Sequence, residues 1–508
     1  MKLASIQQKS LLAVCVFLYV LVTCMYFYQG ANVNVNSRFA LARTLAEEGS
    51  VWIDTYASAT VDKSFLNGHY LSDKAPGISI LSAAVLFCAN PIIDAITEDK
   101  HIRANARLYL LQFVFLALFS AWCMVLFFRW ISELLGEKKR MLAFALATLG
   151  FSSILAFPYA TLFFSHQISG NILFMAAYYV FHPDKLRSWT SRLGVLFLIG
   201  WGATIEYPPV PILGCFYGVL LWRFWKSRQT TQLRWFPVFL IPGIINISMF
   251  AVYNLVAFGS PFAIGYQHLH LAGFQQGMSE GLMGVNWPSF GTMMALLFST
   301  FRGLFYTDPV LLCALPAVWF GARKKELRPL CFVCTAVFLY FWLLNSGYHF
   351  WAGGGCLGPR HMVASVLFLW LAVGFLPSRC LEFPGFWVLA FSSAIYMLAA
   401  TSVTLILGEN IDNPLWDYVL PLFATGNMSI SAFPMFSEDV PRFSDTSAFY
   451  FASFNLGELL FGLTGRQSLL PLCLWQMFVF CCGLVTNGAL TSFKKVLTDG
   501  GGHSEKTQ

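Results

Sequence analysis

Apolar segments, most of them near the length that crosses a lipid bilayer, recur along the whole chain. They lie near residues 10–29, 108–128, 141–160, 168–182, 193–222, 235–258, 309–321, 329–345, 362–378, 384–408 and 468–490. Stretch 193–222 is interrupted by Glu206-Tyr207-Pro208-Pro209, so it predicts two short spans with this motif at the tip of a hairpin. Because a spanning helix needs about 20 apolar residues, the pattern predicts an all-α polytopic transmembrane bundle of about 12 spans.

The composition agrees with lipid as the solvent of this chain. Hydrophobic residues make up 57% of the 508 residues and charged residues only 11%. A typical soluble domain is about 25% charged, so a soluble fold of this length is excluded. The net charge of +7 is modest, and no basic surface pattern indicates nucleic acid as a partner.

The apolar stretch 77–95, broken by Asn90-Pro91, decides the topology. If it lies on the outer surface, 21 of the 32 Lys and Arg residues fall inside and 11 outside. If it crosses the bilayer, every later loop changes side and only 9 of the 32 fall inside. Because cytoplasmic loops carry the excess of Lys and Arg, we expect a surface helix and two cytoplasmic termini.

This topology leaves three long outer segments: 30–107, 259–308 and 409–467. We expect a transmembrane core over residues 1–408, with its active-site loop at 30–107. Residues 409–508 would add an outer segment, the last transmembrane helix and a short cytoplasmic tail. The protein would lie in the inner (plasma) membrane with its active site on the outer, periplasmic side.

The first outer segment is the richest in chemically active side chains. Cleaving a lipid-phosphate sugar needs a cation for the leaving phosphate and a carboxylate that takes the proton of the incoming hydroxyl. Lys74 meets the first need, with His69 as a further donor-binding candidate, and Asp54, Asp62 or Asp73 meets the second. Each alone could equally be a solvated loop charge or half of a structural ion pair. The three aspartates with His69 could also hold a divalent metal ion, although their spacing matches no metal motif and no cofactor is predicted.

Later segments add candidates for the same site. Tyr348 and Trp351 precede a run of glycines, and could stack on a sugar or belong to the aromatic belt of a membrane protein. Arg360 and Arg302 are candidates for binding the donor phosphate, since a guanidinium pairs well with phosphate oxygens. Glu206 is the most deeply placed acid, and an ionisable group there is a functional candidate, assigned here to substrate binding. A lone boundary histidine such as His166 is more often structural.

These residues resemble the GT-C superfamily of membrane glycosyltransferases. The similarity is to the protein O-mannosyltransferase and lipid A aminoarabinose transferase group of family 39, and to bacterial enzymes with an RgtA/B/C/D-like domain. It covers the first 260 residues most clearly, and more loosely the Trp-x-Gly-Gly and Gly-Pro-Arg block at 351–360. In that family the first outer loop ends in a Lys-Pro-Pro-like motif whose Lys contacts the carrier phosphate. Ser72-Asp73-Lys74-Ala75-Pro76-Gly77 stands in that place, so the resemblance assigns this role to Lys74.

One departure from the family affects the chemistry directly. The family usually has an Asp-Glu pair followed by Arg-Tyr just after the first span, and one acid of the pair is catalytic. The matching stretch here is Asn36-Ser37-Arg38-Phe39, so the acid is missing. Either the base has moved to another aspartate of the loop, or the mechanism differs, or activity is lost.

The sequence therefore predicts a glycosyltransferase that moves a sugar from a polyprenyl-phosphate donor to a glycan, lipid or protein acceptor, in contact with membrane lipids. The resemblance implies direct displacement with inversion. One alternative is a lipid or sugar transporter or flippase, which Glu206 alone supports. Another is a non-catalytic envelope assembly protein, which the missing acid pair supports.

Overall fold

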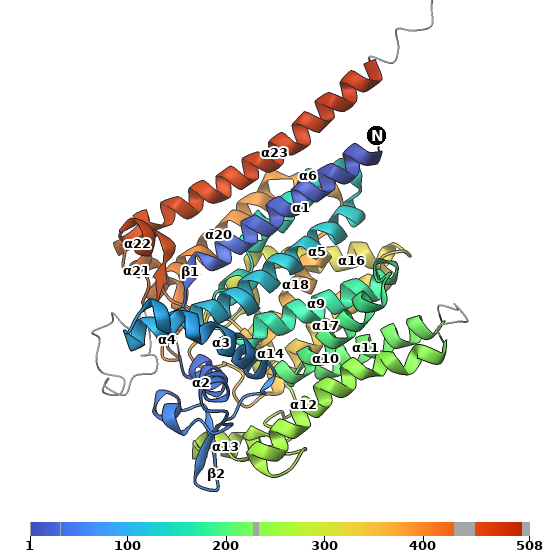
Figure 1. Ribbon diagram of the computed structural model, residues 1–508. Helices are drawn as coiled ribbons and strands as arrows, with labels where there is room; N and C mark the ends of the chain where they lie inside the picture. The colour runs from blue at the N-terminus through green and yellow to red at the C-terminus, as the bar shows by residue number, and fades with distance from the viewer. Residues whose placement is uncertain (1, 31, 227–232, 431–452, 500–508) are drawn as a thin grey trace, which may run out of the picture.

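The computed structural model describes residues 2–30, 32–226, 233–430 and 453–499. Helices make up 73% of the structure and strands 4%, which confirms the expected all-α class. Figure 1 shows the long helices running side by side through the molecule, with α2, α13 and β2 gathered at one end of the bundle.

Six helices of the described part are long and apolar enough to cross a membrane. They are Gly77–Ile96, Lys100–Leu135, Pro237–Phe258, Arg328–Gly347, Pro384–Val403 and Gly465–Asn487. Shorter apolar helices cover Ser10–Met25, Pro309–Arg323 and Arg360–Val373. The chain therefore has the helices of a polytopic membrane protein.

Helices from distant parts of the chain surround the candidate site. They are α2 (Val33–Glu47), α3 (Gly77–Ile96), α4 (Lys100–Gln112), α5 (Leu118–Leu135), α9 (Ser165–Phe181), α10 (Trp189–Ile205), α11 (Val210–Lys226), α17 (Arg328–Gly347) and α18 (Val363–Val373). His182, just after α9, lies 2.8 Å from Glu133 near the end of α5. Trp201 near the end of α10 packs 5.6 Å from Phe119 at the start of α5. The starts of α5 and α9 and the end of α10 therefore share one end of the bundle.

Helix α3 lies across that same end. At its start, the Gly77 carbonyl accepts a hydrogen bond from Trp201 Nε1 at 2.9 Å. Near its other end, Asn90 and Asp94 accept hydrogen bonds from Arg107 at 2.9 and 2.7 Å. Arg107 belongs to α4, which continues through a π-helical turn into the start of α5. Both ends of α3 thus contact residues at one end of the bundle. We call this end the α3 end.

A short hairpin shapes the loop before α3. Strands β2 (Lys63–Leu66) and β3 (His69–Ser72) are antiparallel and pair Lys63 with Ser72. Asn67 and Gly68 form their two-residue turn with φ of 53° and 89°. Asn-Gly is the preferred sequence for such a turn, because both positions need positive φ. The sequence of the turn therefore fixes the register of the hairpin.

The predicted continuous span at 141–160 is wrong in detail. The structure divides it into α6 (Arg140–Ala147), α7 (Leu149–Ser152) and α8 (Ala156–Tyr159). The Thr148 and Ser153 hydroxyls donate to the carbonyls of Phe144 and Gly150, both at 2.8 Å. Such side-chain bonds compete with the helical ladder, and Pro158 cannot donate to it.

The described C-terminal residues pack on the N-terminal core. Strand β1 (Phe27–Tyr28) pairs with β4 (Phe454–Asn455). Gln476 of α23 (Leu470–Asp499) donates to the hydroxyl of Thr23 in α1 (Lys2–Met25) at 3.1 Å. Figure 1 shows α23 running alongside α1. The last helix is therefore part of the same bundle.

Candidate active site

The β2–β3 hairpin brings two of the candidate aspartates together. Because Lys63 pairs with Ser72 in an antiparallel ladder, the next pair outward is Asp62 and Asp73. The chain then turns through Lys74 into α3. One short hairpin thus places two carboxylates and one ammonium group at the α3 end of the bundle.

Lys74 is shared between the two aspartates. Its Nζ lies 2.9 Å from Asp62 Oδ2 and 2.9 Å from Asp73 Oδ2. The side chains of Asp73 and Lys74 are 2% and 8% exposed, whereas that of Asp62 is 26% exposed. Of the two acids, Asp62 is therefore the more accessible from solvent.

The two carboxyl groups differ in their tendency to hold a proton. Burial raises the pKa of Asp73, an effect that Lys74 only partly offsets and that the charge of Asp62 reinforces. Burial acts on Asp62 too, but Lys74, followed by Arg360 and Arg38, outweighs it and lowers the pKa of Asp62. Asp73 is therefore the acid whose proton affinity is better suited to accepting a proton near neutral pH.

The stretch that lacks the acid pair contacts Asp73 directly. Ser37 on α2 donates a hydrogen bond from Oγ to Asp73 Oδ1 at 3.2 Å, and its Oγ lies 2.9 Å from Ser72 Oγ. Asn32 caps α2 by accepting from the backbone N–H groups of Asn34 and Val35, which fixes where the helix starts. The Ser37 side chain is therefore held against the Asp73 carboxylate.

A second polar chain extends from the next residue of α2. Arg38 donates to Ser165 Oγ at 2.7 Å, and Ser165 donates to Glu206 Oε1 at 2.8 Å. His166 Nδ1 makes a short contact with the same carboxylate oxygen. Glu206 lies between α10 and α11, at the predicted hairpin tip. Burial would raise the pKa of Glu206, but His166, Arg38 and Ser165 together lower it to about 2.

Arg360, at the start of the 3-10 turn before α18, completes the cluster from the other side. Its guanidinium lies 5.6 Å from the centre of the Phe164 ring and is close enough to Asp62 to lower the pKa of that group. Within the described ranges its guanidinium makes no hydrogen bond or ion pair, and its Nε is buried. A half-buried cation whose Nε lacks a polar partner is suited to an anionic ligand.

Tyr348 and His361 lie near Arg360. Their rings are 5.5 Å apart, and His361 lies 5.2 Å from His166. Tyr348 donates to Met278 Sδ at 3.4 Å. The Nε2 atoms of His166 and His361 are buried without a hydrogen-bond partner among the described residues. Two imidazoles and a guanidinium therefore offer unused polar atoms in one region.

Asp54 and His69 lie outside this cluster. Asp54 Oδ2 is 2.7 Å from His69 Nδ1, and Asp54 Oδ1 accepts from the Tyr70 backbone N–H at 2.7 Å. The His69 ring stacks on Trp52 at 3.9 Å. These side chains are about two-fifths exposed, at 43% and 38%. Their contacts hold the outer side of the hairpin rather than the shared lysine.

Arg302 and Trp351 are also placed elsewhere. Arg302 is fully buried and donates to the carbonyls of Ala352, Phe301 and Gly354 at 2.9–3.0 Å. The Trp351 and Phe301 rings pack edge to face, with their centroids 6.4 Å apart. Arg302 thus holds the glycine-rich loop in shape, and its donors are occupied by backbone oxygens.

The described residues contain no group of three or more His, Cys, Asp and Glu side chains placed to hold a metal ion. The aspartates and His69 divide into two separate pairs, Asp62 with Asp73 and Asp54 with His69. The four therefore do not form the single metal site considered from the sequence.

The sequence indicated no site role for Arg38 or His361 and favoured a structural role for His166. Arg38 had one usable signal, since it stands where the resembling family has its Arg. The two histidines are far apart in the chain, and only the packing of α9 against α18 brings them together. No local pattern could have indicated that pairing.

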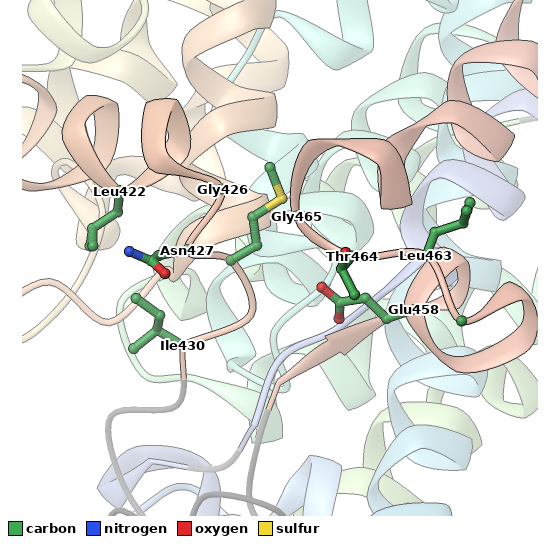
Figure 2. Close-up of a pocket in the computed structure, with 10 residues that line it drawn as sticks. Leu422, Gly426, Asn427, Ile430, Glu458, Leu463, Thr464 and Gly465 are labelled. Atoms are coloured by element: carbon green, nitrogen blue, oxygen red, sulfur yellow. The ribbon is translucent and has the colours of Figure 1, made fainter.

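A separate cavity lies away from these residues. Its volume is about 580 Å³. Figure 2 shows it between α21 (Leu420–Thr425) and α22 (Leu456–Phe461), with Glu458 and Asn427 on its wall. Glu458 accepts from Ser429 Oγ at 2.8 Å and from the Asn455 N–H at 3.2 Å. The protein's own donors therefore already engage its carboxylate.

No protein-family model matches the chain, and no match to it is found among curated proteins. The assignment of function therefore depends on the geometry described above.

Proposed function

We propose that the protein is a membrane glycosyltransferase that takes its sugar from a polyprenyl-phosphate donor. The observation that carries the proposal is the Lys74 ammonium shared by Asp62 and Asp73, with the unpartnered guanidinium of Arg360 beside them. This set supplies cations for a leaving phosphate and carboxylates for a proton, which are the two requirements of the reaction.

In the proposed reaction, an acceptor hydroxyl oxygen attacks the anomeric carbon while the carbon–oxygen bond to the carrier phosphate breaks. Asp73 takes the proton of the hydroxyl, and Asp62 keeps Lys74 charged and in place. Lys74 and Arg360 stabilise the negative charge that develops on the leaving polyprenyl phosphate. Direct displacement inverts the anomeric configuration. Tyr348 and Glu206 contact the sugar or the acceptor.

The proposal includes a topology of about 12 spans with both termini in the cytoplasm. The α3 end then faces outward, at the outer surface of the inner membrane. The long α4–α5 helix supports this direction, because its far end precedes the basic cluster at Lys138, Lys139 and Arg140. A polyprenyl carrier would then present its phosphate at the level of Lys74.

The position of Glu206 favours transfer over transport. A transporter places its ionisable groups near the middle of the bilayer on broken helices. Glu206 instead lies at the α3 end and is linked through Ser165 to Arg38, the neighbour of Ser37. It therefore belongs to the same cluster as the two aspartates.

The test uses purified full-length protein in detergent with a panel of radiolabelled polyprenyl-phosphate sugars. Asp73→Asn should lower sugar transfer or release by about 100-fold or more, because it removes the proton acceptor. Asp54→Asn is the matched control, since Asp54 lies in the same loop but outside the cluster, and it should stay within about 3-fold of wild type. Folded wild-type protein that neither binds nor turns over any donor would contradict the proposal.

A further inference from the structure

A polar cavity lies at the end of the bundle opposite to the α3 end. Its volume is about 400 Å³, and it opens between the start of α1, the end of α5 and the end of α9. In Figure 1, α1 runs beside α5 and α5 runs beside α9. Polar side chains on its wall include Arg129, Ser132, Glu133, Tyr178, Tyr179 and Lys185.

Glu133 is the acid among these side chains, and it is already engaged. Its carboxylate lies 2.8 Å from His182 Nε2 and 3.7 Å from Lys185 Nζ. His182 is held in turn, because its ring stacks on Tyr178 at 4.4 Å and its Nδ1 lies 2.9 Å from the Tyr178 carbonyl. These contacts fix the shape of the wall and occupy its negative charge.

Arg129 stays outside this pairing. It stands four residues before Glu133 on α5, a spacing at which helical residues commonly form an ion pair. Among the described residues its guanidinium nevertheless makes no hydrogen bond or ion pair, and the side chain is exposed. Its charge acts on the hydroxyls of Tyr178 and Tyr179. The cavity therefore presents an available guanidinium beside two phenol groups.

Ser132 supplies a second, independent observation. The residue is 8% exposed, and its Oγ is buried without a hydrogen-bond partner in the described part of the chain. A serine within a helix often donates to the carbonyl one turn back, as Ser392 does to Val388 at 2.9 Å. A buried hydroxyl that makes no such bond costs free energy, so it is suited to donating to an acceptor atom inside the cavity.

The cavity is reached from the lipid-facing side of α5. Trp122 and Arg129 are both exposed, and their spacing of about two helical turns puts them on one face of the helix. Leu11 and Val14 on the neighbouring α1 are exposed as well. Because these apolar side chains belong to the surface that meets acyl chains, Arg129 lies where that surface reaches the headgroups.

We propose that this cavity binds the phosphate of an anionic lipid headgroup. The Arg129 guanidinium pairs with the phosphate oxygens, and Ser132 donates a hydrogen bond to them. In the proposed topology this end faces the cytoplasm, where basic pockets between spans bind anionic headgroups. A choline headgroup carries its own cation, which Arg129 and Lys185 repel. This binding goes beyond the proposed function, because it needs no turnover and uses no residue of the candidate active site.

The test measures lipid binding to the full-length protein by native mass spectrometry after partial delipidation in detergent. The probes are phosphatidylglycerol, phosphatidylcholine and inorganic phosphate. Arg129→Gln should weaken phosphatidylglycerol binding by about 5- to 10-fold, because it removes the charged bonds to the phosphate. Arg379→Gln is the matched control and should bind as wild type does. Arg379 is an exposed arginine on α19 (Ser378–Glu382), whose Glu382 contacts Lys139 just after α5.

Ser132→Ala tests the same cavity without changing its charge. The hydroxyl has no partner to lose among the described residues, so this variant should keep the wild-type Tm and still weaken phosphatidylglycerol binding by about 3-fold. Equal binding of phosphatidylglycerol to wild type, Arg129→Gln and Ser132→Ala would overturn the proposal. So would wild-type protein that binds phosphatidylcholine as tightly as phosphatidylglycerol. Inorganic phosphate that binds as tightly as phosphatidylglycerol would overturn it in favour of a site for free phosphate.

Discussion

The Ser37 hydroxyl donates a hydrogen bond to the Asp73 carboxylate at 3.2 Å. The two residues are far apart in the sequence, and the contact joins the start of α2 to the end of the β2–β3 hairpin. Ser37 stands where the resembling family carries one acid of its Asp-Glu pair. Asp73 therefore brings a carboxylate from the loop to within hydrogen-bond distance of the position that lacks one.

This contact predicts that the acid can be exchanged between the two positions. Asp73→Asn should lower transfer by about 100-fold or more, and adding Ser37→Asp should restore at least about 10-fold of that loss. Initial rates with a fixed donor measure both effects. Ser37→Asn/Asp73→Asn is the matched control and should restore nothing. If Ser37→Asp/Asp73→Asn transfers sugar no faster than this control, the two positions are not equivalent.

Protonation of Asp73 should cause the fall in rate on the acid side of the pH–rate profile. Its pKa is raised above the ordinary 3.8 by burial, with the charge of Asp62 adding to the effect, whereas that of Asp62 is lowered. The rate should therefore fall as the pH drops through the raised pKa of Asp73. Asp62→Asn removes a negative neighbour, so this fall should move to lower pH in that variant. A fall that moves to higher pH or stays in place would contradict this assignment.

Much of the fold was predictable from local patterns, because membrane solvation imposes them. Runs of apolar residues predicted the helices. The Asn67-Gly68 turn was also readable, and it sets the register that joins Asp62 to Asp73. The breaks in the apolar segment 141–160 could not be predicted. Hydroxyl-to-carbonyl hydrogen bonds such as that of Thr148 do not change the hydropathy of the sequence.

The candidate site was predictable only in part, because tertiary packing decides which distant residues join it. Lys74, Asp62 and Asp73 lie within one loop, so short-range geometry brings them together. Arg302 and Arg360 look alike in sequence, since each is an arginine beside glycine or proline near a helix start. Only tertiary packing separates them, because it gives Arg302 three carbonyl acceptors and leaves Arg360 without a polar partner among the described residues.

Lys74 should be needed for stability as well as for turnover. Lys74→Ala leaves two carboxylates side by side without their shared cation, and breaking such a pair typically costs about 3–5 kcal/mol. Thermal unfolding in detergent should show a clearly lower Tm than for Lys324→Ala, an exposed lysine used as control.

The same pair predicts how stability depends on pH. The lowered pKa of Asp62 stabilises the fold above about 3.8, and this contribution is lost as the pH falls through the folded-state pKa. Lys74→Ala should remove that part of the acid sensitivity. Unchanged Tm and an unchanged pH dependence would mean that the shared lysine is not an ion-pair partner in solution.

The buried Arg302 and the half-buried Arg360 should give opposite phenotypes. Arg360→Gln should raise the KM for the lipid donor by about 10-fold or more with little change in Tm, because its guanidinium has no polar partner to lose. Arg302→Gln should lower the stability by at least about 2–3 kcal/mol, since it strands buried carbonyl groups of the glycine-rich loop. Paired measurements of Tm and donor KM check both. A reversed pattern would assign the donor phosphate to Arg302.

Gly265 should report on the position of the Asp73 backbone. A Cβ atom at residue 265 would lie 2.7 Å from the Asp73 Cα and 2.9 Å from its carbonyl oxygen, so the backbone has to move. Overpacking of this kind costs about 1–3 kcal/mol, and here it displaces the proposed base directly. Gly265→Ala should therefore lower kcat more than its Tm alone would suggest.

Gly214→Ala on α11 is the matched control, because nothing lies within 4 Å of the added methyl group. Replacing a helical glycine by alanine is neutral or stabilising by up to about 1 kcal/mol, so this variant should keep both its activity and its Tm. If Gly265→Ala also kept full activity, the Asp73 backbone would have to tolerate a shift of several tenths of an ångström. A carboxylate that tolerates such a shift is not held as a general base must be, and the assignment of Asp73 would fail.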